Sequence, residues 1–357
     1  MLKFNSRGYL DMVRGIYVRE ETYSNEYRTP LTPTGVAQLV KAGFLIYIQS
    51  SDRRIFRNLE YEIVGAKITS LPWYNSQFRN FMILGIKELE NVERLDAHTH
   101  LYFSHCFKGQ NCASGILSAF SKSKSKLYDY EFLCDENGKR LIAFGWYAGA
   151  VGAALGLHFY TCRDRGSLKP WVSIEDMVGS VATISSSCKI AVLGAEGRCG
   201  RGVCSILDRL KINFDRIGKM DSTDSLLNYD LVFNCILLDP EYKKTWFTSD
   251  AITERHIVIV DISCDYSKPN NPIPLYTAAT SWEQPVLEIG NYSIIAIENL
   301  PSLLPRESSE HFSEKLVTLL LDFDKDSSRV WERCIEAFRK AVERNEVHSS
   351  LPANTTA

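Results

Sequence analysis

A glycine-rich turn between a buried strand and a helix limits this chain to few folds. Residues 189–193 are mostly apolar and predict a short buried strand, and residues 201–210 predict a helix with an apolar face. Between them lie Gly194, Gly197 and Gly200, where a tight turn lets backbone N–H groups approach a phosphate closely. A strand, a glycine turn and a helix in this order are typical of α/β domains with parallel sheets.

The turn predicts a dinucleotide, although its spacing is unusual. The glycines follow the pattern G-x-x-G-x-x-G in place of the common G-x-G-x-x-G. Asp221 lies about 20 residues beyond the turn, where a carboxylate binds the ribose hydroxyls of NAD and disfavours NADP. A glycine turn of an α/β domain without nucleotide is the alternative. We therefore predict NAD as the cofactor.

Strands and helices alternate along the whole chain, which predicts an α/β fold with parallel sheets. The helix at 143–159 contains several glycines and is shorter than the about 20 apolar residues that span a bilayer, so we expect it to be buried and the protein to have no membrane segment. The Ser/Lys-rich run 121–126 is expected to be an exposed loop. Further strands are predicted at 45–48, 81–86, 101–104, 230–236, 256–262 and 292–297, and further helices at 35–42, 308–321 and 328–345.

Composition indicates which kind of partner and which cellular compartment to expect. The 357 residues suit two domains better than one. A net charge of -2, from 41 Lys and Arg against 43 Asp and Glu, argues against nucleic acid and favours a small-molecule partner. The 10 cysteines form no CxxC pair and the N-terminus is charged throughout, unlike a signal peptide. We therefore expect free, mostly buried thiols in the cytoplasm.

Two titratable side chains directly follow predicted strands. Lys87 follows residues 81–86, and His105 follows residues 101–104. Open α/β sheets bind ligands at the carboxyl ends of their strands, so Lys87 is a candidate base and His105 a candidate acid or base. The alternatives are a solvated Lys87 beside Glu88, which the local sequence favours, and a hydrogen-bonded core histidine.

Other polar residues are less informative from position alone. His98 and His100 would lie on one face of an extended segment, but no nearby carboxylate or cysteine has a convincing ligand spacing, so we expect no metal site. Arg28 and Arg140 could each bind a carboxylate bidentately. Their positions do not separate that role from an exposed arginine.

A series of motifs in a fixed order resembles a known family. The motifs are RTPLTP (28–33), GIKE (85–88), FSHCFK (103–108), YDYEFL (128–133), AFGWYAG (143–149), GAEGRCG (194–200), NNPIPLY (270–276) and LPSLLPRE (300–307). Together they resemble saccharopine dehydrogenase of the NAD-dependent, lysine-forming type, from about residue 28 to residue 321. The unusual glycine spacing is shared with that family.

The resemblance implies a fold and a reaction. It implies two Rossmann-like domains around an interdomain cleft: a substrate domain of residues 1–143 plus 305–357, and an NAD-binding domain of residues 144–304. The implied reaction is the reversible, NAD-dependent oxidative deamination of saccharopine to L-lysine and 2-oxoglutarate, a step of lysine biosynthesis. The resemblance also implies a monomer.

Residue roles follow from the same motifs. Lys87 matches the base that takes a proton from the secondary amine, and His105 matches the group that activates water. Glu88 and Glu131 match acids that tune these two groups by charge. The matched substrate contacts are Arg28, Arg140, Phe144 and Ser263. The matched cofactor contacts are Lys139, Gly197, Arg198, Asp221, Ser225, Leu237, Ile262, Ile297, Glu298, Asn299 and Leu300, and Cys199 and Cys235 match a pair that can form a disulfide in the family.

Two positions depart from the family pattern. Glu298-Asn299 stands where the family has Asp-His, and Arg201 stands where a small residue is usual.

Three alternatives to the saccharopine enzyme remain at this point. An alanine dehydrogenase-like enzyme shares the two-domain plan and a Lys/His pair, and an opine-type enzyme would differ only in its amino-acid pocket. A non-catalytic NAD-binding regulator is the third. The LPSLLPRE and AFGWYAG motifs favour the saccharopine enzyme, and the intact Lys87 and His105 favour an enzyme over a regulator.

Overall fold

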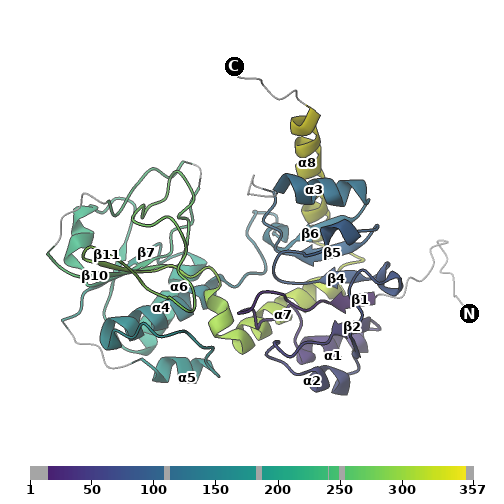
Figure 1. Ribbon diagram of the computed structural model, residues 1–357, viewed down its shortest axis with the longest axis horizontal. Helices are drawn as coiled ribbons and strands as arrows, with labels where there is room; N and C mark the ends of the chain where they lie inside the picture. Colours follow the sequence, from purple (N-terminus) through teal and green to yellow (C-terminus); the bar gives the residue numbers. More distant parts are fainter. Residues whose placement is uncertain (1–14, 108–112, 182–186, 240, 249–253, 351–357) are drawn as a thin grey trace, which may run out of the picture. The chain divides into compact units, whose positions relative to one another are not determined.

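The chain divides into two compact units. The computed structural model describes residues 15–107, 113–181, 187–239, 241–248 and 254–350, with side chains up to residue 347. Met1–Ala143 and Ser309–Ala357 form one unit, here called the N-terminal unit, and Phe144–Ser308 form the central unit. Each unit contains one six-stranded sheet (Figure 1). The predicted α/β fold with two Rossmann-like units is confirmed, and both sheets are mostly parallel.

The sheet of the N-terminal unit is entirely parallel, in the order β3-β2-β1-β4-β5-β6. After β3 the chain crosses to the other side of β1 and continues with β4, so the strand order reverses between β1 and β4. Its strands are β1 (Gly15–Val18), β2 (Leu45–Gln49), β3 (Lys67–Thr69), β4 (Met82–Leu84), β5 (Thr99–Tyr102) and β6 (Lys126–Asp129). Its helices are α1 (Pro33–Lys41), α2 (Asn58–Ile63), α3 (Ala113–Lys122) and α8 (Val330–Ser350), with 3-10 turns η1 (Ser76–Phe78), η2 (Val92–Arg94) and η3 (Tyr130–Phe132).

Two C-terminal helices complete this unit. Most of α7 (Pro305–Leu321) belongs to it, and α8 lies beside α3 and β6 (Figure 1). The backbone N–H of Thr32 donates to Ser313 Oγ at 3.0 Å, and the ring of Phe312 lies 4.9 Å from that of Tyr130. A hydrogen bond and a ring contact between residues far apart in the sequence therefore hold α7 to the rest of this unit.

The central unit repeats the plan, with its strand order reversing between β7 and β9. The sheet order is β11-β12-β10-β9-β7-β8, parallel except for β11. Its strands are β7 (Ile190–Leu193), β8 (Asp215–Ile217), β9 (Leu231–Asn234), β10 (Ile257–Asp261), β11 (Leu287–Ile289) and β12 (Tyr292–Ile295). Its helices are α4 (Gly145–Cys162), α5 (Ile174–Gly179) and α6 (Arg198–Arg209), with 3-10 turns η4 (Asp224–Asn228) and η5 (Leu300–Leu303). No helix in the described part of the chain has the length and apolarity that crossing a bilayer requires.

Apolar composition explains why the predicted strands were found. Every residue of β7, β9, β10 and β12 is buried, as expected for parallel strands that are covered on both faces. The predicted strands all exist, although β4 is shorter than the apolar run 81–86. In contrast, β1, β3, β6, β8 and β11 were missed. The apolar run of β1 stands directly between Arg14 and Arg19.

Two local predictions were wrong. The run 121–126 is not one exposed loop: α3 includes residues 121 and 122, Ser125 is buried and accepts a hydrogen bond from the backbone N–H of His98, and β6 begins at residue 126. Helix α6 begins at Arg198, three residues before the predicted start at 201. The second part of the glycine turn therefore forms the first turn of a helix.

Glycines let α4 and α6 pack with their backbones in contact. A Cβ atom added to Gly149 of α4 would lie 1.9 Å from the carbonyl oxygen of Cys199, and one added to Gly202 of α6 would lie 2.0 Å from that of Trp146. These distances are far below van der Waals contact, and the obstacle in both cases is backbone. The glycines are therefore required by the packing of the two helices.

Replacing Gly202 by alanine should destabilise the central unit by about 1–3 kcal/mol, because the helices must separate to admit a methyl group. Thermal or urea denaturation followed by circular dichroism measures the change. The matched control is Gly115→Ala in α3, where an added Cβ meets nothing within 4 Å. It should be neutral or stabilising by up to about 1 kcal/mol. Equal stability of the two variants would contradict the packing argument.

Candidate functional site

Three neighbouring strands of the N-terminal unit end in titratable side chains. β4 pairs with β5 and β5 with β6, and the ladder continues beyond β4 as Phe103 N–H donates to the carbonyl oxygen of Ile86 at 3.1 Å. Lys87 follows β4, His105 follows β5 and Glu131 follows β6. The structure thus brings these predicted residues to one carboxyl edge of the sheet, beside the point where the strand order reverses. Ligands bind at that position in open α/β sheets.

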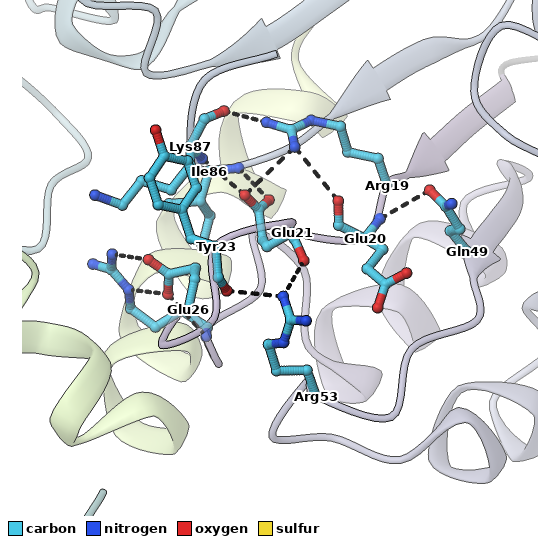
Figure 2. A network of polar contacts seen from close by, with 10 residues as sticks. Arg19, Glu20, Glu21, Tyr23, Glu26, Gln49, Arg53, Ile86 and Lys87 are labelled. Atoms are coloured by element: carbon cyan, nitrogen blue, oxygen red, sulfur yellow. Dashed lines mark hydrogen bonds and ion pairs between the residues drawn. The ribbon is translucent and has the colours of Figure 1, made fainter. Parts of the chain in front are cut away.

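Lys87 is half-buried and has an aromatic and an acidic neighbour. Its Nζ lies 5.5 Å from the ring centroid of Tyr23, and its charge contributes to lowering the pKa of Glu26. Figure 2 shows the lysine side chain beside the tyrosine ring. Glu88, the next residue, is also half-buried. Lys87 is therefore not the fully solvated lysine of the alternative interpretation.

Arg28 forms a buried ion pair with Glu26. Its Nε donates to Glu26 Oε1 at 2.7 Å, its Nη2 lies 2.5 Å from Glu26 Oε2, and the two side chains are 5% and 0% exposed. Burial opposes ionisation of Glu26, but the Arg28 guanidinium outweighs it, and the pKa of Glu26 is lowered. A bidentate pair of this kind fixes the guanidinium plane.

Arg140 and Glu131 also lie together. Arg140 Nη2 donates to Glu131 Oε1 at 3.0 Å, with 32% and 15% of the two side chains exposed. An antiparallel bridge between Cys134 and Arg140 holds the hairpin that carries the exposed Lys139. The predicted substrate-binding arginine and tuning acid therefore act on each other directly.

His105 lies in a strained and exposed position. Its φ angle is 50°, in the left-handed region that non-glycine residues rarely adopt. Its ring stacks on Phe103 with centroids 6.2 Å apart. The preceding Ser104 is fixed by Asp129, whose Oδ2 accepts from the backbone N–H at 2.9 Å and from the hydroxyl at 2.5 Å. Strained backbone of this kind tends to occur at functional sites.

His98 and His100 belong to the core. Their rings pack against Trp73 at 5.2 Å and 4.9 Å. Burial lowers the pKa of His100 well below its ordinary value, so the ring is neutral. In the described residues, no cluster of three or more His, Cys, Asp or Glu side chains could hold a metal ion.

In the central unit, the predicted cofactor residues lie near the carboxyl edge of the sheet. Each strand from β7 to β10, and β12, is followed by at least one of them, and Ser225 lies in η4, between β8 and β9. Gly197 and Arg198 follow β7, Asp221 follows β8, Leu237 follows β9, Ile262 follows β10, and Ile297, Glu298, Asn299 and Leu300 follow β12. The predicted substrate contact Ser263 comes directly after Ile262. Phe144, the buried residue that precedes α4, is at the start of the unit.

The turn after β7 fits a pyrophosphate. Gly194 has a φ of 70°, which suits glycine, and a Cβ on Gly200 would lie 2.2 Å from the carbonyl oxygen of Gly194. Gly197 is the N-cap of α6, and no described side chain caps the helix there. The turn is therefore compact, and the first N–H groups of α6 are not used by the helix ladder. With the positive end of the helix dipole, they suit an anion.

Asp221 lies on the surface beyond β8. Its Oδ2 accepts from the backbone N–H of Gly218 at 2.7 Å, so the carboxylate is held on the turn that leaves the strand. The backbone carbonyl of Asp221 accepts a hydrogen bond from Lys244 Nζ. An oriented, exposed carboxylate at this strand end suits the hydroxyls of a ribose.

The other predicted positions differ in exposure. Ser225 and Ser263 donate from Oγ to the carbonyl oxygens of Ser222 and Ile236, at 2.6 Å and 2.7 Å. Glu298 accepts from the Tyr266 hydroxyl at 2.9 Å, and Asn299 accepts from Trp282 Nε1 at 3.0 Å, so both family departures have local partners. Leu237 is 91% exposed, whereas the side chains of Ile262, Ile297 and Leu300 are buried. The buried three would reach a ligand chiefly through their backbone.

Cys199 is half-buried and Cys235 is buried. Burial raises the pKa of Cys235 well above its ordinary value, and the neighbouring Cys199 adds to the effect. The two are therefore close in space. Their oxidation to a disulfide stays a prediction.

Four residues of the site were not predicted from the sequence. Arg19, Glu21, Tyr23 and Glu26 follow β1 and lie around Lys87 or Arg28 (Figure 2). The available signal was the short apolar run 15–18 directly before charged residues. It has the same pattern, a strand followed by a titratable group, that identified Lys87.

Comparisons with known proteins agree with this geometry. Residues 17–151 match the family model "Alanine dehydrogenase/PNT, N-terminal domain". In solved structures, the chain resembles an L-alanine dehydrogenase with a TM-score of 0.71 and 16% identity, over 93% of this chain and 99% of that one. It resembles a transhydrogenase from Sinorhizobium meliloti with a TM-score of 0.64 and 14% identity, over 86% and 94% of the two chains. At these identities the likeness establishes the fold alone.

Proteins related in sequence identify the family and not only the fold. The chain is 34% identical to the saccharopine dehydrogenase [NAD(+), L-lysine-forming] of Yarrowia lipolytica, over 92% of this chain and 98% of the relative. The identity is also 34%, with the same coverage, for the protein of that name from Schizosaccharomyces pombe. For the Neurospora crassa protein it is 33%, over 92% and 96% of the two chains. The chain belongs to the NAD-dependent, L-lysine-forming saccharopine dehydrogenase family.

Proposed function

We propose that this protein oxidises saccharopine with NAD and water to L-lysine, 2-oxoglutarate and NADH. The observation that carries the proposal is the placement of Lys87 and His105 on adjacent strand ends, next to the strand-order reversal of the N-terminal unit. Amine oxidation followed by hydrolysis needs two separate proton carriers, and this edge of the sheet supplies them. Family membership supports the choice of saccharopine as substrate.

Lys87 acts in the oxidation step. NAD, when bound, would supply the acceptor for the hydride of the carbon that carries the secondary amine. Lys87, as the base, takes the proton from the nitrogen of that amine, so that a carbon–nitrogen double bond forms. The ring of Tyr23 on one side and the negative Glu26 on the other orient the lysine side chain. The aromatic ring and the carboxylate both attract the protonated amine, so they hold it at a defined position.

His105 acts in the hydrolysis step. Its ring takes a proton from water as the water oxygen bonds to the imine carbon, and gives that proton to the nitrogen. The ring then takes the hydroxyl proton as the carbonyl of 2-oxoglutarate forms and the carbon–nitrogen bond breaks, and passes this second proton to the leaving nitrogen, which becomes the amine of lysine. The exposed position of His105 suits a group that must exchange protons with water. Glu88 and Glu131 tune both groups through their charge.

Arginines are suited to the carboxylates of saccharopine. We assign Arg28 and Arg140 to substrate carboxylates, each oriented by an acidic partner, Glu26 or Glu131. Phe144 and Ser263 are the proposed substrate contacts of the central unit. The domain assignment follows: residues 1–143 plus 305–357 bind the substrate, and residues 144–304 bind NAD.

Product analysis tests this proposal. Purified protein incubated with saccharopine and NAD should yield lysine, 2-oxoglutarate and NADH in equal amounts, measured by mass spectrometry and absorbance. NADH without lysine would assign the protein to another amino-acid dehydrogenase. Binding of NAD without any product would favour the regulatory alternative.

Asp221 should determine the preference for NAD. Asp221→Ser removes the carboxylate, and we expect NAD affinity to fall about tenfold, the loss of a charged hydrogen bond. Isothermal titration with NAD and NADP measures both affinities. Asp224→Ser, three residues further on, is the control and should leave NAD affinity unchanged. An unchanged ratio of the two affinities in Asp221→Ser would remove Asp221 from the cofactor site.

The cellular compartment and the oligomeric state are also proposals. Scattered cysteines without a CxxC pair favour the reducing cytoplasm, and the resemblance to the family favours a monomer. Sedimentation of the purified protein with and without NAD tests the second point. A dimer at micromolar concentration would contradict it.

A further inference from the structure

A buried ion pair, Arg19 with Glu21, contacts the backbone of the segment that carries Lys87. Arg19 and Glu21 follow β1, and their side chains are 5% and 6% exposed, with Arg19 Nη1 3.5 Å from Glu21 Oε2. β1 and β4 are neighbours in the sheet, and the strand order reverses between them. The pair therefore lies where the sheet offers its ligand-binding crevice.

The pair holds both peptide groups of Lys87. Glu21 Oε2 accepts from the backbone N–H of Lys87 at 3.0 Å, and Glu21 Oε1 accepts from that of Ile86 at 2.7 Å. The Arg19 guanidinium donates to the carbonyl oxygen of Lys87. Figure 2 shows these contacts converging on the lysine backbone while its side chain extends away from the pair. The backbone on each side of the Lys87 Cα is thus fixed.

The neighbouring sequence makes room for this arrangement. A Cβ on Gly85 would lie 2.1 Å from Arg19 Nε and 2.3 Å from its Cζ, so only glycine admits the guanidinium at that point. The strand ladder is already satisfied here, because Arg19 N–H donates to the Leu84 carbonyl oxygen at 2.9 Å. The side-chain pair is therefore additional to what the sheet needs for its hydrogen bonding.

Physical chemistry argues against stability as the reason for the pair. Desolvating two charges costs so much that well-packed apolar residues often replace a buried pair without loss of stability. A charged pair does provide directional contacts to a peptide N–H and to a carbonyl at fixed positions. With both held, only side-chain torsions move Nζ, and the lysine keeps its place beside Tyr23.

We infer that Arg19 and Glu21 are positioning residues, which act on the reaction by fixing the backbone of Lys87. The inference rests on the proposed role of Lys87 as the base of the oxidation step. It predicts that Glu21 matters for turnover only while Lys87 is present. Displacement of a reacting group by about 1 Å costs on the order of 100-fold in rate.

A double-mutant cycle tests this dependence. The proteins are the wild type, Glu21→Gln, Lys87→Met and the double variant, assayed for NADH formation with saccharopine as a function of pH. Glu21→Gln should lower kcat about 10- to 100-fold, leave the KM for NAD unchanged, and shift the limb of the pH profile that disappears in Lys87→Met. In the Lys87→Met background it should change the residual rate by less than about twofold, since coupled residues are non-additive.

Controls separate positioning from folding. Glu20→Gln makes the same change of charge one residue away, at a half-buried side chain, and should leave the rate unchanged. If Glu21→Gln does not fold by circular dichroism, Glu21→Asp and Arg19→Lys keep both charges but shorten or alter the contact, and they enter the same cycle.

The outcomes are distinct. An equal fold-loss from the Glu21 variant in both backgrounds would overturn the positioning role, because the loss would not act through Lys87. Wild-type turnover in Lys87→Met would instead overturn the proposed base. A loss confined to the background with Lys87, together with the shifted pH limb, supports the inference.

Discussion

Replacing Lys87 by methionine should lower saccharopine-dependent NADH formation by about 10²- to 10⁴-fold, the usual contribution of a general base. Methionine keeps an unbranched apolar side chain of similar length but cannot accept a proton. The backbone at this position is held by Glu21 and Arg19 and does not depend on the lysine side chain. We therefore expect the variant to fold and to bind NAD as the wild type does.

Steady-state absorbance and NAD titration measure the two effects separately. Lys41→Met is the matched control, an exposed lysine at the end of α1 in the same unit, and it should retain the wild-type rate. A small added amine should partly restore activity to a Lys87→Ala variant, since a free base can replace the missing one. A Lys87→Met variant with the wild-type rate would contradict the assignment of the base.

Replacing Glu26 by glutamine should lower the free energy of unfolding by about 3–5 kcal/mol, the usual cost of breaking a buried ion pair. The change removes the countercharge of the buried Arg28 guanidinium, which Glu26 contacts through both carboxylate oxygens. Denaturation by urea at pH 7 measures the loss. The double variant Glu26→Gln/Arg28→Met should recover part of it, because neither charge of this pair remains.

The contribution of the Arg28–Glu26 pair to the free energy of unfolding should depend on pH. The pKa of Glu26 is lowered in the folded protein, so its contribution is complete above the ordinary glutamate pKa of 4.5 and is lost as the pH falls through the lowered value. The difference in the free energy of unfolding between wild type and Glu26→Gln should therefore become smaller at acidic pH. Asp96→Asn is the control, since the Arg79–Asp96 pair is 54% and 65% exposed and should matter by less than about 1 kcal/mol. Equal losses in the two variants would contradict the role of burial.

Much of the architecture could be predicted from the sequence because parallel strands are continuous apolar runs. β7, β9 and β10 are buried throughout and lie between glycine or polar turns. Each can therefore be recognised from the sequence alone. β1 is equally buried, but Arg14 and Arg19 stand directly on either side of its apolar run, so that the run resembles part of a polar segment. The start of α6 was placed late because glycines normally end a helix, whereas here they permit its close packing on α4.

The site was only partly predictable, for a different reason. Lys87 and His105 were found because strand ends are recognisable in a sequence and carry ligand-binding residues in parallel sheets. Glu21 was not, since a buried carboxylate looks like a solvated one until its partners are known, and those partners lie 65 and 66 residues away. His98 and His100 show the converse, because histidines spaced like metal ligands proved to be core residues packed on Trp73.

The most direct test of the account is NADH formation by the purified protein with NAD and saccharopine, with alanine measured in parallel. We predict NADH with saccharopine, none with alanine, and a loss of the signal in both Lys87→Met and His105→Gln. NADH from alanine alone would contradict the proposed substrate. A signal from saccharopine that survives in both variants would contradict the proposed site.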